Sequence, residues 1–185
     1  MSLLAEVVVE EWLNRQGYFT IRGIRLGNDE IDILAIRVGE NGVLERRHFE
    51  VQASSRPIGY IGRLPKAVQM ETGLTARSAK ARTDEQLAVG AKEWVDRKFC
   101  QKQKEQLRTL LASGTWTHEL VIHRVKEVKE VKMIEARGVK VWRISDILKE
   151  LDKGKAYLIK SATGADLIEL MLIGDPENTF LNKRK

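Results

Sequence analysis

Two carboxylates and an amide stand inside stretches of sequence that otherwise resemble buried β-strands. Asp32 interrupts the apolar run from 31 to 36, and Glu50 and Gln52 alternate with Phe49 and Val51. Because alternate residues of a strand share a face, Glu50 and Gln52 project to one side and the two apolar residues to the other. An ionised carboxylate in such surroundings is costly unless it is paired or binds a metal. These positions are therefore candidates for chemistry.

The chemistry that fits two neighbouring acids is metal binding through oxygen. If the two strands pair, the side chains of Asp32 and Glu50 lie about 5 Å apart. Carboxylates at that distance repel and raise each other's pKa unless a cation lies between them. Oxygen ligands favour Mg²⁺ or Mn²⁺ over zinc, and backbone carbonyls and waters can complete an octahedron. Cys100 is the single cysteine, so neither an internal disulfide nor a cysteine-based zinc site is possible.

A third carboxylate is expected from a helix over residues 2–16, which Gly17 ends. The apolar face of this helix repeats at helical spacing through Ala5, Val8, Val9, Trp12 and Leu13. Glu6 borders this stripe and can point toward the sheet. Glu10, one turn further on, is the alternative, and Glu11 is expected on the solvent face.

Ordinary ion pairs are the competing explanation for each acid. Asp32 and Glu50 each have two arginines nearby as possible partners, namely Arg25 or Arg37 for the first and Arg46 or Arg47 for the second. A glutamate at the edge of an amphipathic helix is usually solvated. Each acid taken alone is therefore unremarkable, and the argument depends on the ordered set.

The elements that must position these residues follow from hydrophobic period and turn signals. Strands are expected over 18–26, 30–38, 43–53, 120–125, 139–144 and 156–159, and helices over 63–73, 84–111, 126–137, 145–151 and 165–172. Residues 75–82 are polar and basic and are expected to form a loop. A strand, helix and strand after residue 120 favour a parallel pair joined by a right-handed crossover. The order predicts an α/β domain with a mixed sheet.

Composition sets broader limits. Hydrophobic residues make up 43% of 185, which suits a single domain over 1–180 followed by a disordered basic tail over 181–185. No apolar run is long enough for a membrane span and no signal peptide is evident, so a cytoplasmic location is the expectation. The net charge of +6 favours polyanions such as nucleic acid, although only weakly. Trp116, Trp142, His118 and His123 are expected to be structural.

Three motifs in order resemble the core of the PD-(D/E)XK nuclease superfamily. They are Glu6 ten residues before Gly17-Tyr18, then Glu30-Ile31-Asp32-Ile33-Leu34-Ala35, then Phe49-Glu50-Val51-Gln52. The chain looks closest to the Holliday-junction-resolvase-like members, and the match covers roughly the first 53 residues. The resemblance implies a restriction-endonuclease-like three-layer core, with a central mixed β-sheet flanked by helices. Such relatives are often homodimers.

The resemblance also implies metal-dependent cleavage of phosphodiester bonds. Asp32 and Glu50 would hold Mg²⁺ or Mn²⁺ with help from the Val51 carbonyl, and Glu6 would complete the site. Gln52 departs from the pattern, because the family has lysine there to orient water and supply charge. A glutamine amide can orient water but carries no charge. Basic residues that could replace the lysine lie after the core strands: Arg63, Lys66, Lys80 and Arg82.

The predicted partner is DNA, contacted through lysine and arginine. The favoured contacts are Lys66, Arg77, Lys80 and Arg82, with further basic clusters at Arg97, Lys98, Lys102 and Lys104 and at Lys126, Lys129, Lys132 and Lys140. No sequence-reading motif is present, so structure-selective or sequence-tolerant cutting is expected. Two alternatives stay open. One is a degenerate nuclease fold that binds nucleic acid without cutting, and the other is an interaction protein whose acids form surface ion pairs.

Overall fold

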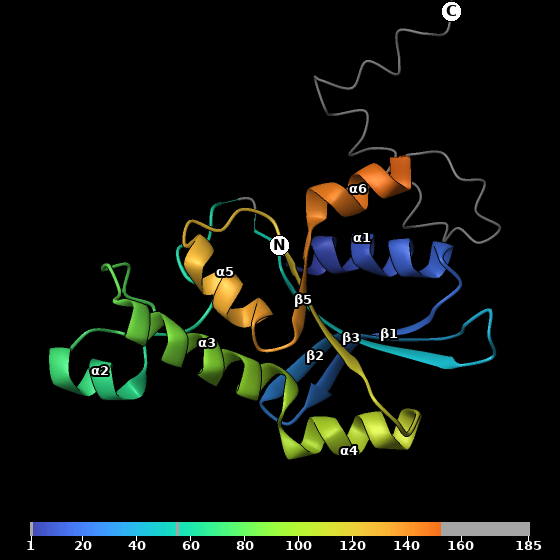
Figure 1. Ribbon diagram of the computed structural model, residues 1–185, viewed down its shortest axis with the longest axis horizontal. Coiled ribbons are helices and arrows are strands. Elements are labelled where there is room, and N and C mark those ends of the chain that lie inside the picture. Colours follow the sequence, from blue (N-terminus) through green and yellow to red (C-terminus); the bar gives the residue numbers. More distant parts are fainter. Residues whose placement is uncertain (1, 55, 153–185) are drawn as a thin grey trace, which may run out of the picture.

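A computed structural model describes residues 2–54 and 56–152 of the chain (Figure 1). The elements in chain order are α1 (Ser2–Arg15), β1 (Phe19–Leu26), β2 (Asp29–Val38), β3 (Leu44–Gln52), α2 (Lys66–Thr72), α3 (Asp84–Phe99), α4 (Lys102–Leu111), β4 (Thr117–Ile122), α5 (Val128–Glu135), β5 (Val139–Arg143) and α6 (Ile144–Asp152). The strand predicted over 156–159, the helix over 165–172 and the tail over 181–185 lie outside the described residues.

The five strands form one mixed sheet in the order β1-β2-β3-β4-β5. The first three strands are antiparallel, and β3, β4 and β5 run parallel to one another. Helix α5 connects β4 to β5, as the predicted parallel crossover requires. The mixed sheet and its position at the centre of an α/β fold are therefore confirmed.

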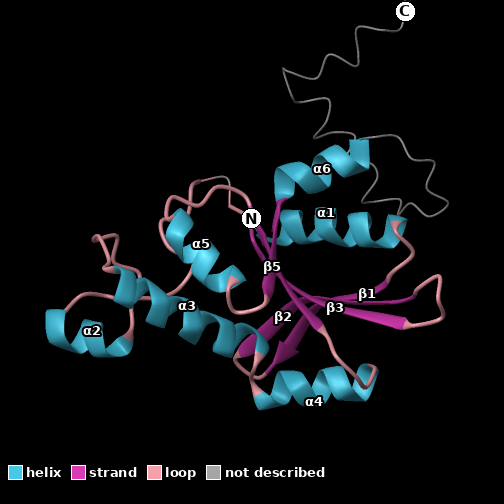
Figure 2. Cartoon of the chain, viewed as in Figure 1, coloured by secondary structure: helices cyan, strands magenta, loops and turns pink. Residues whose placement is uncertain are grey.

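Helices cover both faces of the sheet, which gives three layers (Figure 2). Helices α1 and α6 pack with Phe49 and Val51 on one face, where Trp12 and Ile147 are buried in the same cluster. Helices α3 and α5 pack on the other face around Leu120. This is the predicted three-layer arrangement. Within the described residues, no helix is long and apolar enough to cross a bilayer.

The helix expected over 84–111 is in fact two helices, so that prediction is wrong. Helix α3 ends at Phe99, and Gln101 has an extended backbone, with φ −71° and ψ 137°, before α4 begins. The apolar face of α3 packs against β4 through Phe99, whereas Leu107 of α4 packs in a separate cluster with Leu34 of β2. The bend lets each helix cover a different part of one sheet face, and it turns Lys104 and Arg108 of α4 inward, where both are buried.

Candidate active site

Asp32 and Glu50 stand beside each other where β2 and β3 separate. The antiparallel register pairs Ile33 with Phe49, and one step further it places Asp32 opposite Glu50. The ladder stops at this point, and Asp32 Oδ2 instead accepts a hydrogen bond of 2.6 Å from the Val51 backbone N–H. The side chain of Asp32 therefore bridges the two strands, and the predicted proximity of the two acids is present in the fold.

The surroundings of Asp32 disfavour its ionised form. Burial and the neighbouring carboxylate of Glu50 raise the pKa of Asp32 from 3.8 to about 7, although Lys98 and the Val51 hydrogen bond act in the opposite direction. A carboxylate with this balance gains from any further positive charge placed beside it. A shift of this kind beside a cavity is typical of functional sites.

Glu50 is fully buried and surrounded by cations that come from the helices. Its Oε2 accepts a hydrogen bond from Lys98 of α3, and its Oε1 lies 3.1 Å from Nζ of Lys104 of α4. Lys104 is 1% exposed, and its ammonium also donates to the carbonyls of Glu30 and Lys98 at 2.7 and 2.9 Å. Three acceptors satisfy the three ammonium hydrogens of Lys104, so this residue is a fixed anchor for Oε1.

His48 contacts the oxygen of Glu50 that Lys104 also contacts, Oε1. Burial and the charges of Arg108, Lys104 and Lys98 lower the pKa of His48 far below its usual range, so the ring is neutral. Arg108 lies 2.8 Å from Nδ1 and can only donate, so Nδ1 carries no proton. The proton is therefore on Nε2, which lies 3.3 Å from Glu50 Oε1. Two donors hold Oε1, and Oε2 faces Lys98.

The competing ion-pair explanations for the two acids do not describe this arrangement. Arg47 forms a bidentate pair with Glu119, with both N···O distances at 2.6 Å, and Arg37 pairs with Glu45. Neither arginine is a partner of Asp32 or Glu50. Both acids are instead placed toward α3 and α4, whose lysines are distant in the sequence.

Glu6 is buried, as its position beside the apolar stripe predicts, with 6% of its surface exposed. It lies on α1, which packs on the sheet face opposite to that of Glu50. Glu11 corrects the sequence prediction, because it is 1% exposed and pairs with Arg15 at 2.6 Å. Glu10 pairs with Arg22 of β1 at 2.8 Å.

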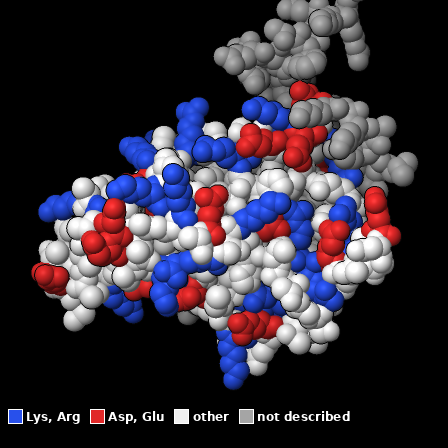
Figure 3. Space-filling view, viewed as in Figure 1, with Lys and Arg blue, Asp and Glu red and all other residues white. Residues whose placement is uncertain are grey.

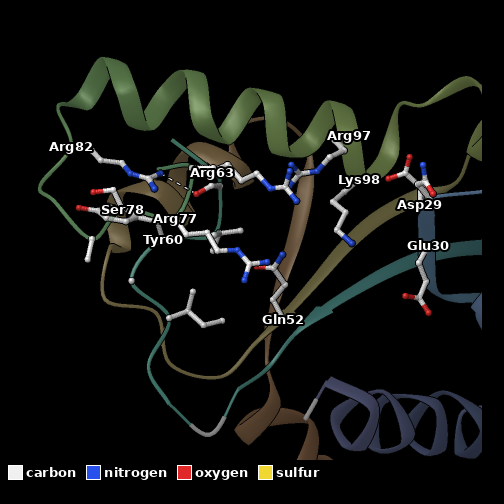
Figure 4. A pocket seen from close by; sticks show the side chains of 17 residues that line it. Asp29, Glu30, Gln52, Tyr60, Arg63, Arg77, Ser78, Arg82, Arg97 and Lys98 are labelled. Atoms are coloured by element: carbon white, nitrogen blue, oxygen red, sulfur yellow. Dashed lines mark hydrogen bonds between the residues drawn. The ribbon is translucent and has the colours of Figure 1, made fainter. Parts of the chain in front are cut away.

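A pocket of about 640 Å³ opens beside the acid pair (Figure 4). Gln52 points into it from the end of β3, and Lys98 marks its border with Glu50. Four arginines also line it, namely Arg63, Arg77, Arg82 and Arg97. Asp29 and Glu30 are its acidic lining residues, so positive charge prevails. Over the face seen in Figure 3 the two signs of charge are interspersed.

Three of the arginines have no acidic partner. Among the described residues, Arg63, Arg77 and Arg97 form no ion pair within 4 Å, although each lines the same pocket. Burial and the like charge of Arg63 lower the pKa of Arg97. Guanidinium groups that converge without an ion pair favour an anion between them, and phosphate suits their planar donors.

The loop that carries Arg63 is fixed by a buried carboxylate. Glu130 of α5 accepts hydrogen bonds from the backbone N–H groups of Ile61 and Gly62 at 2.7 and 2.8 Å. Arg82 donates to the Gly62 carbonyl at 3.0 Å and stacks on the ring of Tyr60. The wall of the pocket formed by residues 58–63 is therefore tied to α5 and to the basic loop.

The predicted nucleic-acid contacts divide into two groups. Arg77 and Arg82 line the pocket, whereas Lys66 at the start of α2 and Lys80 are not among its lining residues, and contact of any of them with nucleic acid stays a prediction. Arg97 and Lys98, which the sequence placed in a second cluster on a helix, line it instead. The signal that could have revealed Arg97 and Lys98 is that they directly precede Phe99, the last buried residue of α3.

The donor set fits a hard divalent cation only in part. Asp32 and Glu50 offer adjacent carboxylate oxygens, and Lys98 shows that the pair accepts a positive charge. Among residues 2–54 and 56–152, no three carboxylate, histidine or cysteine side chains gather as one metal-binding group. A metal at this place would therefore depend on the two acids together with backbone oxygens and water.

His118 and the two tryptophans have the structural roles predicted for them. His118 stacks on Phe99 with ring centroids 4.6 Å apart, and burial lowers its pKa to about 4. Trp116 is buried, and Trp142 packs edge-on against Trp12 and donates to Glu119 at 2.6 Å.

Comparison with known proteins gives no family for the chain. No family model matches it, and no curated protein matches it. The crystal structure of a protein of unknown function, AF1548, is similar over 80% of this chain and 66% of that one, with 16% identity and a TM-score of 0.45. The chain thus spans about two-thirds of that protein, and a likeness this distant gives no information about activity.

Proposed function

We propose that the chain is a metal-dependent deoxyribonuclease that hydrolyses phosphodiester bonds and requires Mg²⁺ or Mn²⁺. The observation that carries this proposal is the junction of two features. Two adjacent carboxylates, the partly buried Asp32 and the fully buried Glu50, lie beside a pocket that holds arginines without an ion-pair partner, and Lys98 contacts Glu50 from the pocket lining. A phosphate of the DNA backbone supplies the anion that the arginines lack, and its placement there brings it to the acids.

The protein groups have separate tasks in this reaction. Asp32 and Glu50 would hold the metal ion, with the Val51 carbonyl as a further ligand that the family resemblance implies. The resemblance also implies Glu6, but α1 covers the opposite face of the sheet and Glu6 does not gather with the two acids among the described residues. The ion would lower the pKa of a water molecule and stabilise the charge that develops on the phosphate. In the hydrolysis, water oxygen bonds to phosphorus and one ester bond to a sugar oxygen breaks. That oxygen gains a proton and the water loses one, which leaves a phosphate monoester and a hydroxyl.

The arginines account for substrate binding. Contacts from Arg63, Arg77 and Arg97 to backbone phosphates carry no sequence information, which supports sequence-tolerant or structure-selective cutting. DNA binding through such contacts should weaken steeply as salt rises.

Cleavage of linear, single-stranded and branched DNA with Mg²⁺, Mn²⁺ or EDTA tests the proposal. The wild-type chain should cut at least one substrate only with metal, and Asp32→Asn and Glu50→Gln should each abolish cutting. Glu40→Gln is the matched control, because Glu40 is exposed in the turn between β2 and β3. Cutting that persists in both site variants would indicate a contaminating nuclease and would sink the assignment.

A non-cutting DNA-binding domain is the second candidate, and one observation favours it. Lys98 already neutralises Glu50, and the neutral Gln52 stands where the resembled family has lysine. If the chain is such a domain, it should bind DNA in a salt-dependent manner and cut it under no metal condition. The leading proposal predicts both salt-dependent binding and metal-dependent cleavage. Gel filtration of the same sample would show whether the chain is the homodimer that the resemblance implies.

A further inference from the structure

We propose that Lys98 supplies the positive charge at the scissile phosphate that Gln52 cannot provide. This inference rests on the proposed nuclease function and assigns a residue on α3 to the site. Lys98 is the single lysine among the residues that line the pocket, and its ammonium contacts Glu50 Oε2. Glu50 and Gln52 lie on the same face of β3, and Gln52 and Lys98 line the same pocket, so Lys98 brings a positive charge to that pocket from the helix side.

The two lysines beside Glu50 differ in what their ammonium groups can still do. Lys104 is 1% exposed and its ammonium donates to three acceptors within the protein. The side chain of Lys98 is 23% exposed, and Glu50 is its hydrogen-bond acceptor among the described residues. An ammonium group has three donors, so Lys98 keeps donors for a phosphate oxygen in the pocket. Lys104 positions Glu50, and Lys98 can contact the substrate.

The charge of Lys98 is secured by the same acids that would hold the metal. The ammonium of Lys98 lies against the carboxylate of Glu50, so it competes with any cation for the oxygens of Glu50. A phosphate in the pocket gives Lys98 an alternative partner on the other side.

The replacements suggested by sequence position fit less well. Arg82 is engaged with the Gly62 carbonyl and the Tyr60 ring, and neither Lys66 nor Lys80 is among the lining residues. Arg63 lines the pocket, but Glu50 forms its contacts with Lys98, Lys104 and His48. Lys98 both contacts Glu50 and lines the pocket.

Charge relocation tests this assignment. The variants are Lys98→Gln, the conservative Lys98→Arg, and the double variant Lys98→Gln with Gln52→Lys, with Lys92→Gln as control. Lys92 is exposed on the same helix and pairs with Asp96. Single-turnover DNA cleavage, and binding of Mn²⁺ without DNA by calorimetry, are measured for each folded variant.

Lys98→Gln should reduce the cleavage rate at least 100-fold, in line with the loss of a group that stabilises transition-state charge. Its affinity for Mn²⁺ should be equal or higher, because a competing cation has been removed. The double variant, in which Gln52→Lys returns the charge from β3, should cleave at least tenfold faster than Lys98→Gln. The cleavage rate of Lys98→Arg should lie between those of the wild type and Lys98→Gln. The control should match the wild type in both measurements.

Several results would overturn the assignment. One is a Lys98→Gln rate within threefold of wild type. Another is a loss of cleavage matched by an equal loss of Mn²⁺ affinity, or one that Gln52→Lys does not relieve, because Lys98 would then only maintain the structure. If Lys98→Gln does not fold, Lys98→Arg and the single variant Gln52→Lys are measured in its place. Their cleavage rates and Mn²⁺ affinities are compared with those of the wild type by the same criteria. A wild-type chain that never cuts DNA refutes the nuclease function itself.

Discussion

Asp32 is expected to reduce the stability of the folded protein at neutral pH, because its ionised form is disfavoured where it lies. Its pKa is about 7 in the fold against an ordinary 3.8, a difference of about 3 units. Each unit corresponds to about 1.4 kcal/mol, so the ionised side chain costs the folded state about 4 kcal/mol above pH 7. Asp32→Asn removes this cost and retains an oxygen that can accept the Val51 hydrogen bond.

The sign and pH window follow from the two protonation states. Below about pH 4 the acid is protonated in both the folded and the unfolded chain, so wild type and Asp32→Asn should be equally stable. Between pH 4 and 7 the unfolded chain loses its proton while the folded chain keeps it, and the stability of the wild type falls. At pH 8 the variant should therefore be more stable by up to about 4 kcal/mol.

Urea unfolding at a series of pH values without metal measures this difference. Glu40→Gln, which removes an exposed acid, should follow the wild type at every pH. A difference between Asp32→Asn and wild type that stays flat from pH 4 to 8, or that favours the wild type at pH 8, contradicts the reasoning. Mg²⁺ at pH 8 should stabilise the wild type but not the variant, and cleavage by the wild type should increase with pH through about 7.

Three further substitutions test the pocket and its supports. Gly62→Ala would bring a Cβ to 2.7 Å from the carbonyl oxygen of Gly90, so a loss of about 1–3 kcal/mol of stability is expected by urea unfolding, whereas Gly59→Ala, which meets nothing within 4 Å, should be neutral. Lys104→Met leaves a buried carboxylate with one fewer cation and should cost about 3 kcal/mol, reduced when Glu50→Gln is added. Arg97→Ala should lower the salt dependence of DNA binding by about one phosphate contact, and an unchanged slope would remove Arg97 from the binding surface.

The sequence alone determined the local features of this protein. Strand alternation placed Glu50 and Gln52 on one face of β3 with Phe49 and Val51 on the other, and the apolar stripe of α1 placed Glu6 inward. These predictions succeeded because the period of an element fixes which of its own side chains share a face. The order of elements then predicted the mixed sheet between helices.

The prediction for Glu11 failed because the same period does not show what covers a face. The helical spacing placed Glu11 outside the apolar stripe, but tertiary packing buries it with Arg15. The break between α3 and α4 was missed for a related reason, since no glycine or proline marks it. The helices part because their apolar faces meet different clusters of the sheet.

The partners of Glu50 were decided by tertiary structure. Lys98 and Lys104 lie 48 and 54 residues after Glu50 in the chain, where the sequence pattern indicates charges on a solvated helix. Folding places α3 and α4 over the end of β3, and there a buried carboxylate is stable only with cations beside it. The sequence could supply the acids and show that they need positive charge. Which side chains provide that charge depends on how the helices cross the sheet, and only the fold contains that information.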